Sequence, residues 1–212
     1  MFKHYMIYKK LFFFIFFLFF SCSNEEEDKK ENLGPLRSEV IVENNVFKIS
    51  YNEIRQQPNW IEYNVRDITK VADRDGMDFY LIYEVRTSDD LDYKNNYWDK
   101  GHMAPAGSFT DSWENLHTTF SFVNCALQRD NLNRGEWREL EEQNRLWAKE
   151  FGTLEIRIEL KFSENSIILK TDAQVPDGFY KHITFPDSTK KCYYFPNEKT
   201  QKNWTEYEIT CN

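Results

Sequence analysis

The sequence predicts an α+β fold with a mixed, mostly antiparallel central sheet that is flanked by helices. Apolar and polar residues alternate over residues 154–160 (LEIRIEL), which is typical of a half-buried strand. Good helix formers fill residues 132–149 instead. Strand-like segments are interspersed with helix but show no βαβ rhythm, so the pattern favours an antiparallel sheet over a parallel one.

The other strands are expected where β-branched and aromatic residues cluster. A turn-rich loop is expected over residues 99–109 (DKGHMAPAGSF), because Gly101, Pro105 and Gly107 interrupt regular structure there. The helix of residues 132–149 should follow this loop and the strand after it. The expected strands are 40–51 (one or two strands), 63–68, 79–85, 120–125, 154–160, 166–169 and 192–195.

The N-terminus divides from the rest of the chain by composition. Three lysines precede a short apolar run at residues 11–20, which predicts a signal peptide of the lipoprotein type over residues 1–21. Cys22 would carry the lipid, residues 22–44 would be a flexible acidic tether, and residues 45–212 would form one domain. We therefore expect an exported protein, lipid-anchored to a bacterial outer membrane or cell surface. The alternatives are a plainly secreted protein and an uncleaved anchor.

The charge balance is acidic. The chain has 27 basic and 35 acidic residues and a net charge of −8. Loss of residues 1–21 would remove three lysines and no acid, which lowers the charge to −11. This balance argues against a generally basic nucleic-acid binder. A nucleic-acid partner would need a local cationic cleft.

Four cysteines occur without C-x-x-C spacing or a Cys/His cluster, which argues against a structural zinc site. Cys125 lies in the apolar run FSFVNCAL and is expected to be a small core residue. Cys192 and Cys211 flank the C-terminal segment. They either pair in an oxidising compartment or remain two thiols, and the sequence favours neither.

Two groups of residues are candidates for chemistry. His102 follows Lys100 and Gly101, so a sharp turn can expose its imidazole beside a cation. Asn133, Trp137, Glu141 and Arg145 recur at intervals of four, which predicts one ridge on the helix, suited to hold a hydrated metal beside a phosphate. The alternative is that Glu141 and Arg145 form a surface ion pair worth about 0.3 kcal/mol.

These motifs resemble a known family. The run DKGHMAPA, followed at a short interval by FSFVNCALQRDNLNRGEWRELEEQNR, resembles the DNA/RNA non-specific endonucleases, which include secreted bacterial nucleases and mitochondrial endonuclease G. The order, internal spacing and separation of the two motifs match the family's pattern. Weaker similarity extends the resemblance over roughly residues 45–210.

The resemblance implies a ββα-metal, or His-Me finger, active site. His102 would be the general base that takes a proton from water. Asn133 would be the single direct protein ligand of Mg²⁺, with Mn²⁺ as an alternative, and Glu141 would reach the ion through water. The ion would stabilise the leaving oxygen.

The same resemblance implies how substrate is held. Lys100 and Arg145 would act in catalysis and contact phosphate, together with Arg74. Asn124 would brace the finger and share in catalysis, and Gln128 would brace it and contact substrate. Lys100 stands where the family usually has arginine, which keeps the charge but loses the planar guanidinium.

The expected function is hydrolysis of DNA and RNA phosphodiester bonds with little sequence specificity, because such enzymes contact the sugar-phosphate backbone. The expected partners are DNA and RNA, a membrane through the lipid on Cys22, and a second copy in a homodimer. The alternative is a catalytically impaired surface lipoprotein that binds nucleic acid or a protein. A third reading is an antagonistic effector nuclease that is held by an inhibitor.

Overall fold

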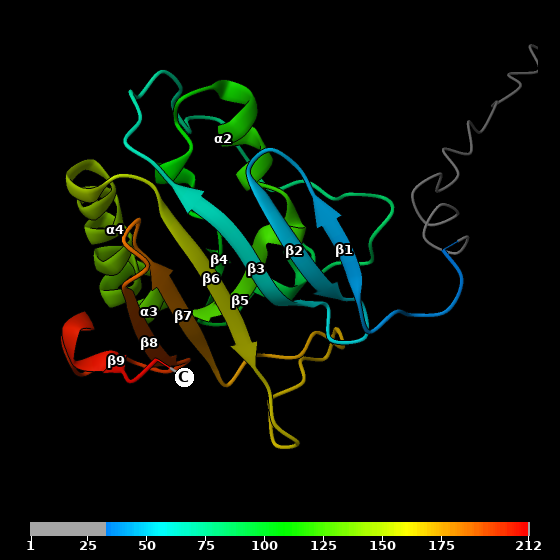
Figure 1. The fold of residues 1–212 in the computed structure, drawn as a ribbon. Coiled ribbons are helices and arrows are strands. Elements are labelled where there is room, and N and C mark those ends of the chain that lie inside the picture. The colour runs from blue at the N-terminus through cyan, green and yellow to red at the C-terminus, as the bar shows by residue number, and fades with distance from the viewer. Residues whose placement is uncertain (1–32, 212) are drawn as a thin grey trace, which may run out of the picture.

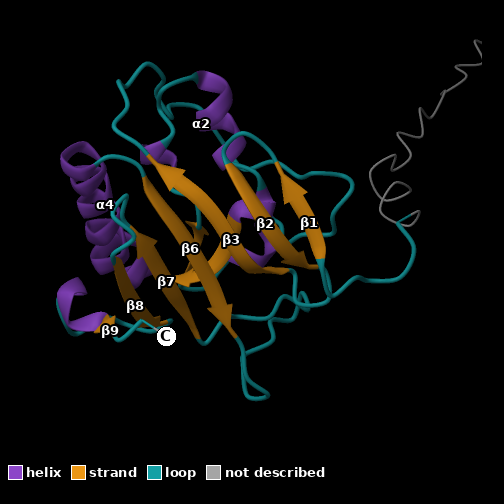
Figure 2. Cartoon of the chain, in the orientation of Figure 1, coloured by secondary structure: helices purple, strands orange, loops and turns teal. Residues whose placement is uncertain are grey.

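A computed structural model describes residues 33–211 of the chain. Its main feature is a seven-stranded sheet in the order β1-β2-β3-β6-β7-β8-β9, in which every neighbouring pair is antiparallel (Figures 1 and 2). A separate pair, β4 and β5, forms a second small sheet. The strands are β1 Val40–Glu43, β2 Phe47–Asn52, β3 Gln57–Val65, β4 Trp98–His102, β5 Cys125–Arg129, β6 Leu154–Lys161, β7 Gly178–Thr184, β8 Lys190–Pro196 and β9 Glu208–Ile209.

The helices are short except for one. They are α2 Trp113–Thr119, α3 Asp130–Leu132 and α4 Arg138–Phe151. Helix α4 buries Leu140 and Ala148, and the turn before it buries Trp137, in the same core as the inward-facing residues of the sheet. The helix ends at Gly152, whose φ of 100° is a left-handed conformation that favours glycine. The sheet therefore has α4 and the β4–β5 pair packed against one face.

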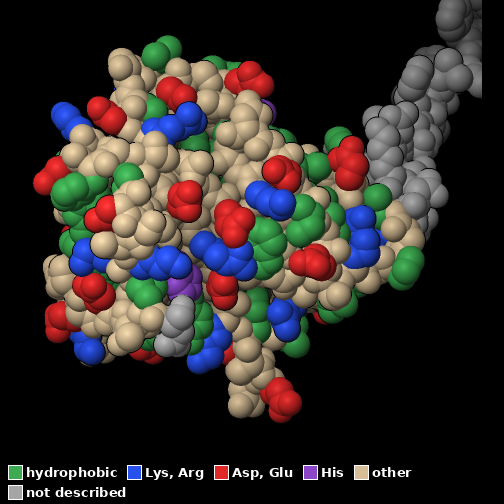
Figure 3. Space-filling model, viewed as in Figure 1, with side chains coloured by type: hydrophobic (Ala, Val, Ile, Leu, Met, Phe, Trp, Pro, Cys, Tyr) green, Lys and Arg blue, Asp and Glu red, His purple; other side chains and the backbone are tan. Residues whose placement is uncertain are grey.

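The predicted fold class is confirmed by this architecture. Strand β6 matches the predicted strand almost residue for residue, and its alternate side chains Leu154, Ile156, Ile158 and Leu160 are buried. On the opposite face Arg157 pairs with Glu62 on the neighbouring strand β3 and with Glu159 on its own strand. Figure 3 shows basic and acidic side chains intermixed over the face of the molecule that it presents. One face of the sheet is thus core and the other is solvated.

Three predicted strands are wrong: residues 79–85, 120–125 and 166–169. Residues 79–85 form turns and loop, with one isolated bridge from Tyr80 to Ser121. Their aromatic character has another cause, since Phe79 packs on His102 instead of in a sheet. Residues 120–125 form a 3₁₀ turn, and the strand begins only at Cys125.

Other boundaries also differ. Strand β3 begins at Gln57, earlier than the predicted 63–68, and residues 166–169 make only a bridge at Ile168. Strands β4 and β7 lie outside the strands that the pattern of β-branched and aromatic residues predicts. Strand β4 overlaps the start of the predicted loop. Gly101, which suggested a turn, lies inside the strand instead, where β5 pairs closely with it.

The predicted helix of residues 132–149 is wrong in its first turns. Residues Asn133–Trp137 form a wide π-type turn, in which Gly135 has non-helical torsions (φ −108°, ψ −115°). Asn133 therefore does not continue the ridge of Glu141 and Arg145 as a regular helix would place it. The position of Asn133 around the helix axis is therefore set by this turn and not by the helical repeat of α4.

The sheet begins at Val40, inside the segment predicted as tether. The predicted signal peptide and Cys22 lie outside the described residues. Among helices of residues 33–211, none is long and apolar enough to cross a membrane.

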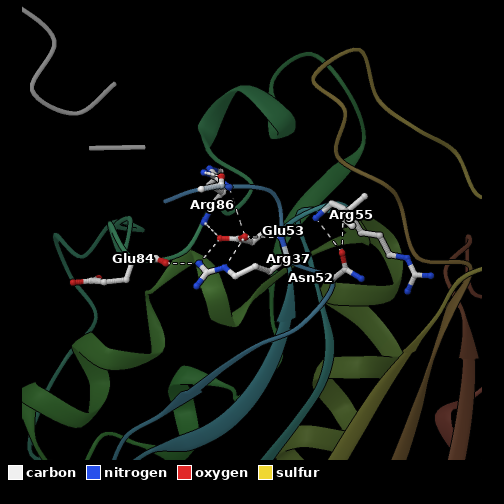
Figure 4. A network of polar contacts seen from close by, with 8 residues as sticks. Arg37, Asn52, Glu53, Arg55, Glu84 and Arg86 are labelled. Carbon is white, nitrogen blue, oxygen red and sulfur yellow. Dashed lines mark hydrogen bonds and ion pairs between the residues drawn. The ribbon is translucent and has the colours of Figure 1, made fainter. Parts of the chain in front are cut away.

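A buried carboxylate fastens the start of the described chain to the sheet (Figure 4). Glu53 follows β2, its side chain is fully buried, and it accepts hydrogen bonds from the Arg37 guanidinium at 2.6 and 2.9 Å and from the Arg86 backbone at 3.1 Å. Arg37 also donates to the carbonyl of Glu84 at 2.7 Å. Burial by itself would raise the pKa of Glu53, but the bonds from Arg37 and Arg86 outweigh it and lower the pKa to about 2.

Candidate active site

A cleft of about 640 Å³ lies between the end of β4 and the α4 helix. Six of the residues singled out from the sequence line it, although they come from four separate segments of the chain. They are Arg74, Lys100, His102, Asn133, Glu141 and Arg145. The structure thus brings the candidate base, the candidate metal ligand and the candidate phosphate contacts to one place.

His102 is the last residue of β4 and pairs with Cys125 on β5. Its ring packs between Phe79 and Phe120, with centroid distances of 4.7 and 4.8 Å. Burial, and to a smaller extent the nearby charge of Arg74, lower the pKa of His102 to about 3. The imidazole is therefore neutral at physiological pH, as a general base must be.

The two ring nitrogens of His102 differ in their surroundings. Nε2 is buried and has no hydrogen-bond partner among residues 33–211. The ring lines the cleft, and with Nε2 buried, Nδ1 is the nitrogen that remains for water or substrate.

Asn124 lies beneath the cleft and is fully buried. Its Oδ1 accepts from the Ala104 amide at 2.7 Å, and its Nδ2 donates to the carbonyls of Ala104 and Thr119 at 2.9 and 2.8 Å. These bonds hold the chain that follows His102. Asn124 does not line the cleft, which suits bracing of the finger, and its share in catalysis stays a prediction.

Gln128 is also fully buried and does not line the cleft. A Cβ built on Gly101 would lie 2.4 Å from the Gln128 Oε1, so glycine is the residue that fits opposite this side chain. Because Gln128 is buried and does not line the cleft, its contact with substrate stays a prediction that this position does not favour. Its role in bracing the β4–β5 pair agrees with its position.

Asn133 is half-buried at the edge of the cleft. Its Nδ2 donates to Asp99 Oδ2 at 2.9 Å, and Asp99 is itself held by two bonds from Arg134 at 2.6 and 2.7 Å. The Oδ1 of Asn133 accepts no hydrogen bond from any described residue. An oriented carboxamide oxygen of this kind suits Mg²⁺, which prefers oxygen ligands and keeps several waters.

Within residues 33–211 no group of three or more His, Cys, Asp or Glu side chains could hold a metal ion. A site with one carboxamide ligand does not require such a group. The donors that are present fit a hydrated cation better than a dehydrated one such as structural Zn²⁺.

Glu141 has a buried counter-charge that the sequence did not reveal. Burial raises the pKa of Glu141, while the charges of Lys181 and Arg145 oppose the rise. Lys181 is fully buried on β7, with its Nζ 4.3 Å from the centre of the Trp137 ring, and burial lowers its pKa to about 8. The signal was present in the sequence, since Lys181 lies two residues from both Phe179 and Ile183 on the buried side of one strand.

The cations of the cleft are unequal. Lys100 is paired with Asp90 and with Asp78 at 3.4 Å, and these partners raise its pKa even though burial acts to lower it. Arg74 and Arg145 form no ion pair with any described residue. The Arg145 guanidinium lies against Gly107, where an added Cβ would be 3.3 Å from Nη1. Free charge for a phosphate therefore comes mainly from the two arginines.

The cysteines take no part in this cleft. Cys125 is buried, its thiol is 3.1 Å from the Tyr93 hydroxyl, and burial raises its pKa to about 12. It is thus an unreactive core residue. The sulfurs of Cys192 and Cys211 are bonded to each other, and the bond ties the C-terminus to β8.

A two-stranded finger whose first strand ends in a neutral histidine, followed by an oriented asparagine in the turn that leads into a helix, is the arrangement of a nuclease of the ββα-metal type. The chain belongs to the DNA/RNA non-specific endonuclease family, whose model matches residues 25–212. This confirms the resemblance that the two motifs carry.

Curated relatives and solved structures agree. Nuclease C1 of Cunninghamella echinulata var. echinulata is 28% identical over 171 residues, which cover 72% of this chain and 68% of that protein. The mitochondrial nuclease EXOG of Mus musculus is 27% identical over 187 residues, or 76% of this chain and 51% of that protein. EXOG of Danio rerio matches over 108 residues, only 32% of its length. The chain thus spans about a third to a half of these EXOG proteins.

A crystal structure of the EndoG/EndoGI complex has the same fold, with a TM-score of 0.74 over 90% of this chain and 88% of that one. The sequence identity is 20%, so the likeness concerns the fold. That structure addresses how EndoG is inhibited.

Proposed function

We propose that this protein is a metal-dependent endonuclease that hydrolyses phosphodiester bonds of both DNA and RNA with little sequence specificity. One observation carries the proposal: His102, Asn133 and Glu141 converge on one cleft that also holds two unpaired arginines. A protein that only binds nucleic acid needs cations but has no use for a neutral histidine opposite an oriented carboxamide.

His102 is the general base in this proposal. In the tautomer with hydrogen on the buried Nε2, the lone pair of Nδ1 is free and could take a proton from an attacking water in the cleft. Phe79 and Phe120 fix the ring, so the base needs little reorganisation. Asn124 holds the backbone behind it.

Asn133 would hold Mg²⁺, or Mn²⁺, through its carboxamide oxygen, and Glu141 would face the ion through water. When bound, the ion supplies Lewis-acid stabilisation of the charge that develops on the phosphate and leaving oxygen. Asp99 orients Asn133 by accepting from its Nδ2. Lys181 keeps a positive charge below Glu141 and so favours its carboxylate form.

Arg74 and Arg145 would contact the phosphate, with Lys100 as a weaker contributor because it already has two acidic partners. Such contacts read the backbone and not the base edges, which accounts for low sequence specificity. DNA and RNA would therefore both be substrates.

The test is a cleavage assay on plasmid DNA and on RNA with purified protein and Mg²⁺, with and without chelator. We expect both to be cut, and chelator to stop the reaction. His102→Ala should lower kcat by about 10²- to 10⁴-fold, the usual contribution of a general base. His182→Ala is the matched control, since His182 lies on the solvated side of β7 beyond the core.

Full activity of His102→Ala would remove the base from this proposal. Tight retention of DNA without turnover by the unchanged protein would instead favour the binding lipoprotein. Circular dichroism of each variant separates loss of chemistry from loss of fold.

We also propose that the protein is exported and lipid-anchored through Cys22. The proposal is supported by the apolar run and the small residue before that cysteine. A Cys22→Ser variant that still partitions into detergent and membrane like the unchanged protein would contradict it.

Homodimer formation follows from the family resemblance and is testable by light scattering.

A further inference from the structure

A second groove adjoins the catalytic cleft, and the first observation about it is its continuity with that cleft. This side groove has a volume of about 410 Å³, and it shares Arg74, Ala106, Gly107 and Arg145 with the cleft. Its charged lining consists of Arg66, Asp67, Lys70, Asp73, Arg74 and Arg145. Whatever binds at the catalytic cleft can therefore extend into the side groove past Arg74 and Arg145.

The second observation is which of the basic side chains already have an acidic partner. In the catalytic cleft Lys100, Arg134 and Arg138 each have an acidic partner. Of the side-groove cations, Lys70 alone has one among the described residues, Asp73 at 2.7 Å. Arg66 is exposed and forms no ion pair with any described residue, like the two arginines that line both cavities. The side groove thus offers to an anion three guanidinium groups that form no ion pair within residues 33–211, beside one such carboxylate, that of Asp67.

The third observation is that the groove is built on a fixed base. The amides of Val71 and Ala72 both donate to the carbonyl of Thr110, at 2.8 and 2.9 Å. Ala72 and Leu116 are buried in one small cluster below the groove. The segment that carries Arg66 and Arg74 is therefore held against the loop that precedes α2, so the two arginines need little ordering when they bind.

From these observations we infer that the side groove binds the phosphodiester backbone of the same substrate strand, next to the phosphate that is cut, with Arg66 as a phosphate contact. The inference rests on the proposed function for its substrate and extends it from one phosphate to a track. A polyanionic strand fits better than a single small anion, because the unpaired guanidinium groups are spread over two connected cavities. Arg66 would then affect binding and leave the chemistry at His102 unchanged.

The experiment uses the full chain, purified in mild detergent, with variants Arg66→Ala, Arg66→Lys and Arg66→Glu. Lys170→Ala is the control, since Lys170 is exposed, lines neither cavity and forms no ion pair with a described residue. Binding of a labelled single strand of about 20 nucleotides is followed by fluorescence anisotropy in chelator, across a range of salt. Cleavage of the same strand, and of a substrate with a single phosphodiester, is measured with Mg²⁺.

Arg66→Ala should weaken binding of the long strand about 5- to 10-fold and reduce the slope of log Kd against log salt by about 0.7. It should raise KM for that strand to a similar extent, with kcat and the single-phosphodiester substrate unaffected. Arg66→Lys should retain most of the affinity, Arg66→Glu should lose more, and Lys170→Ala should match the unchanged protein.

Unchanged affinity and salt slope in both Arg66→Ala and Arg66→Glu overturn the inference, as does an equal loss on the long and short substrates. Failure of the proposed function looks different. Protein that binds the strand through Arg66 but never cleaves it refutes the nuclease and supports the track. Protein that neither binds nor cleaves refutes both.

Discussion

Glu53 gives the sharpest test of how the described chain is held together (Figure 4). The perturbation is Glu53→Gln, which preserves shape and removes the charge. The carboxylate has a pKa of about 2 in the folded protein against 4.5 as its ordinary value, and each unit is worth 1.36 kcal/mol. The charge should therefore contribute about 3 kcal/mol to the free energy of unfolding at pH 7.

The sign of the pH dependence follows from the lowered pKa. Since the unfolded chain takes up the proton first, the contribution is complete above about pH 4.5 and is lost as the pH falls toward 2. Near pH 3 about half of it should remain. Glu53→Gln should thus destabilise strongly at pH 7 and much less at pH 3.

The assay is urea unfolding followed by tryptophan fluorescence at both pH values, with thermal melts beside it. For a domain of this size, about 3 kcal/mol should lower Tm by roughly 6–12 °C. Glu43→Gln is the control, because its partner Lys48 and Glu43 itself are both well exposed, and it should change stability by less than about 1 kcal/mol. A Glu53→Gln effect that is the same at pH 7 and pH 3 would refute the reasoning.

Two further outcomes are expected. Gly101→Ala should lower the free energy of unfolding by about 1–3 kcal/mol and also lower activity, because the added Cβ would lie 2.4 Å from the Gln128 Oε1, beside His102. An unchanged midpoint in chemical denaturation would contradict this. The acid limb of kcat/KM should lie below pH 5 and not near 6.5, because burial and then Arg74 lower the pKa of His102 to about 3. The same shift should weaken folding as pH falls from 6.5 toward 3, since the unfolded histidine binds the proton more tightly. A pH–rate profile with its acid midpoint near 6.5 would count against a buried base.

Local patterns in the sequence were enough to predict an element wherever the spacing of buried side chains along the chain decides its structure. The alternation of residues 154–160 specified strand β6 because one face of it is core and the other is solvent. The motif DKGH with the later N-x-G-x-W placed His102 and Asn133 in the same family site. Residues 79–85 misled because aromatic residues suit a strand and a cleft wall equally well.

The amino-acid sequence by itself therefore determined the fold class, the family and the candidate catalytic and binding residues, since these depend on residue types at short spacing. Only the tertiary structure decided which of them meet. It brought Arg74 to His102, set Lys181 beneath Glu141, and buried Gln128 behind Gly101. Such neighbours are separated by tens of residues, and their contact depends on strand register and on the turn at Gly135, which no local pattern encodes.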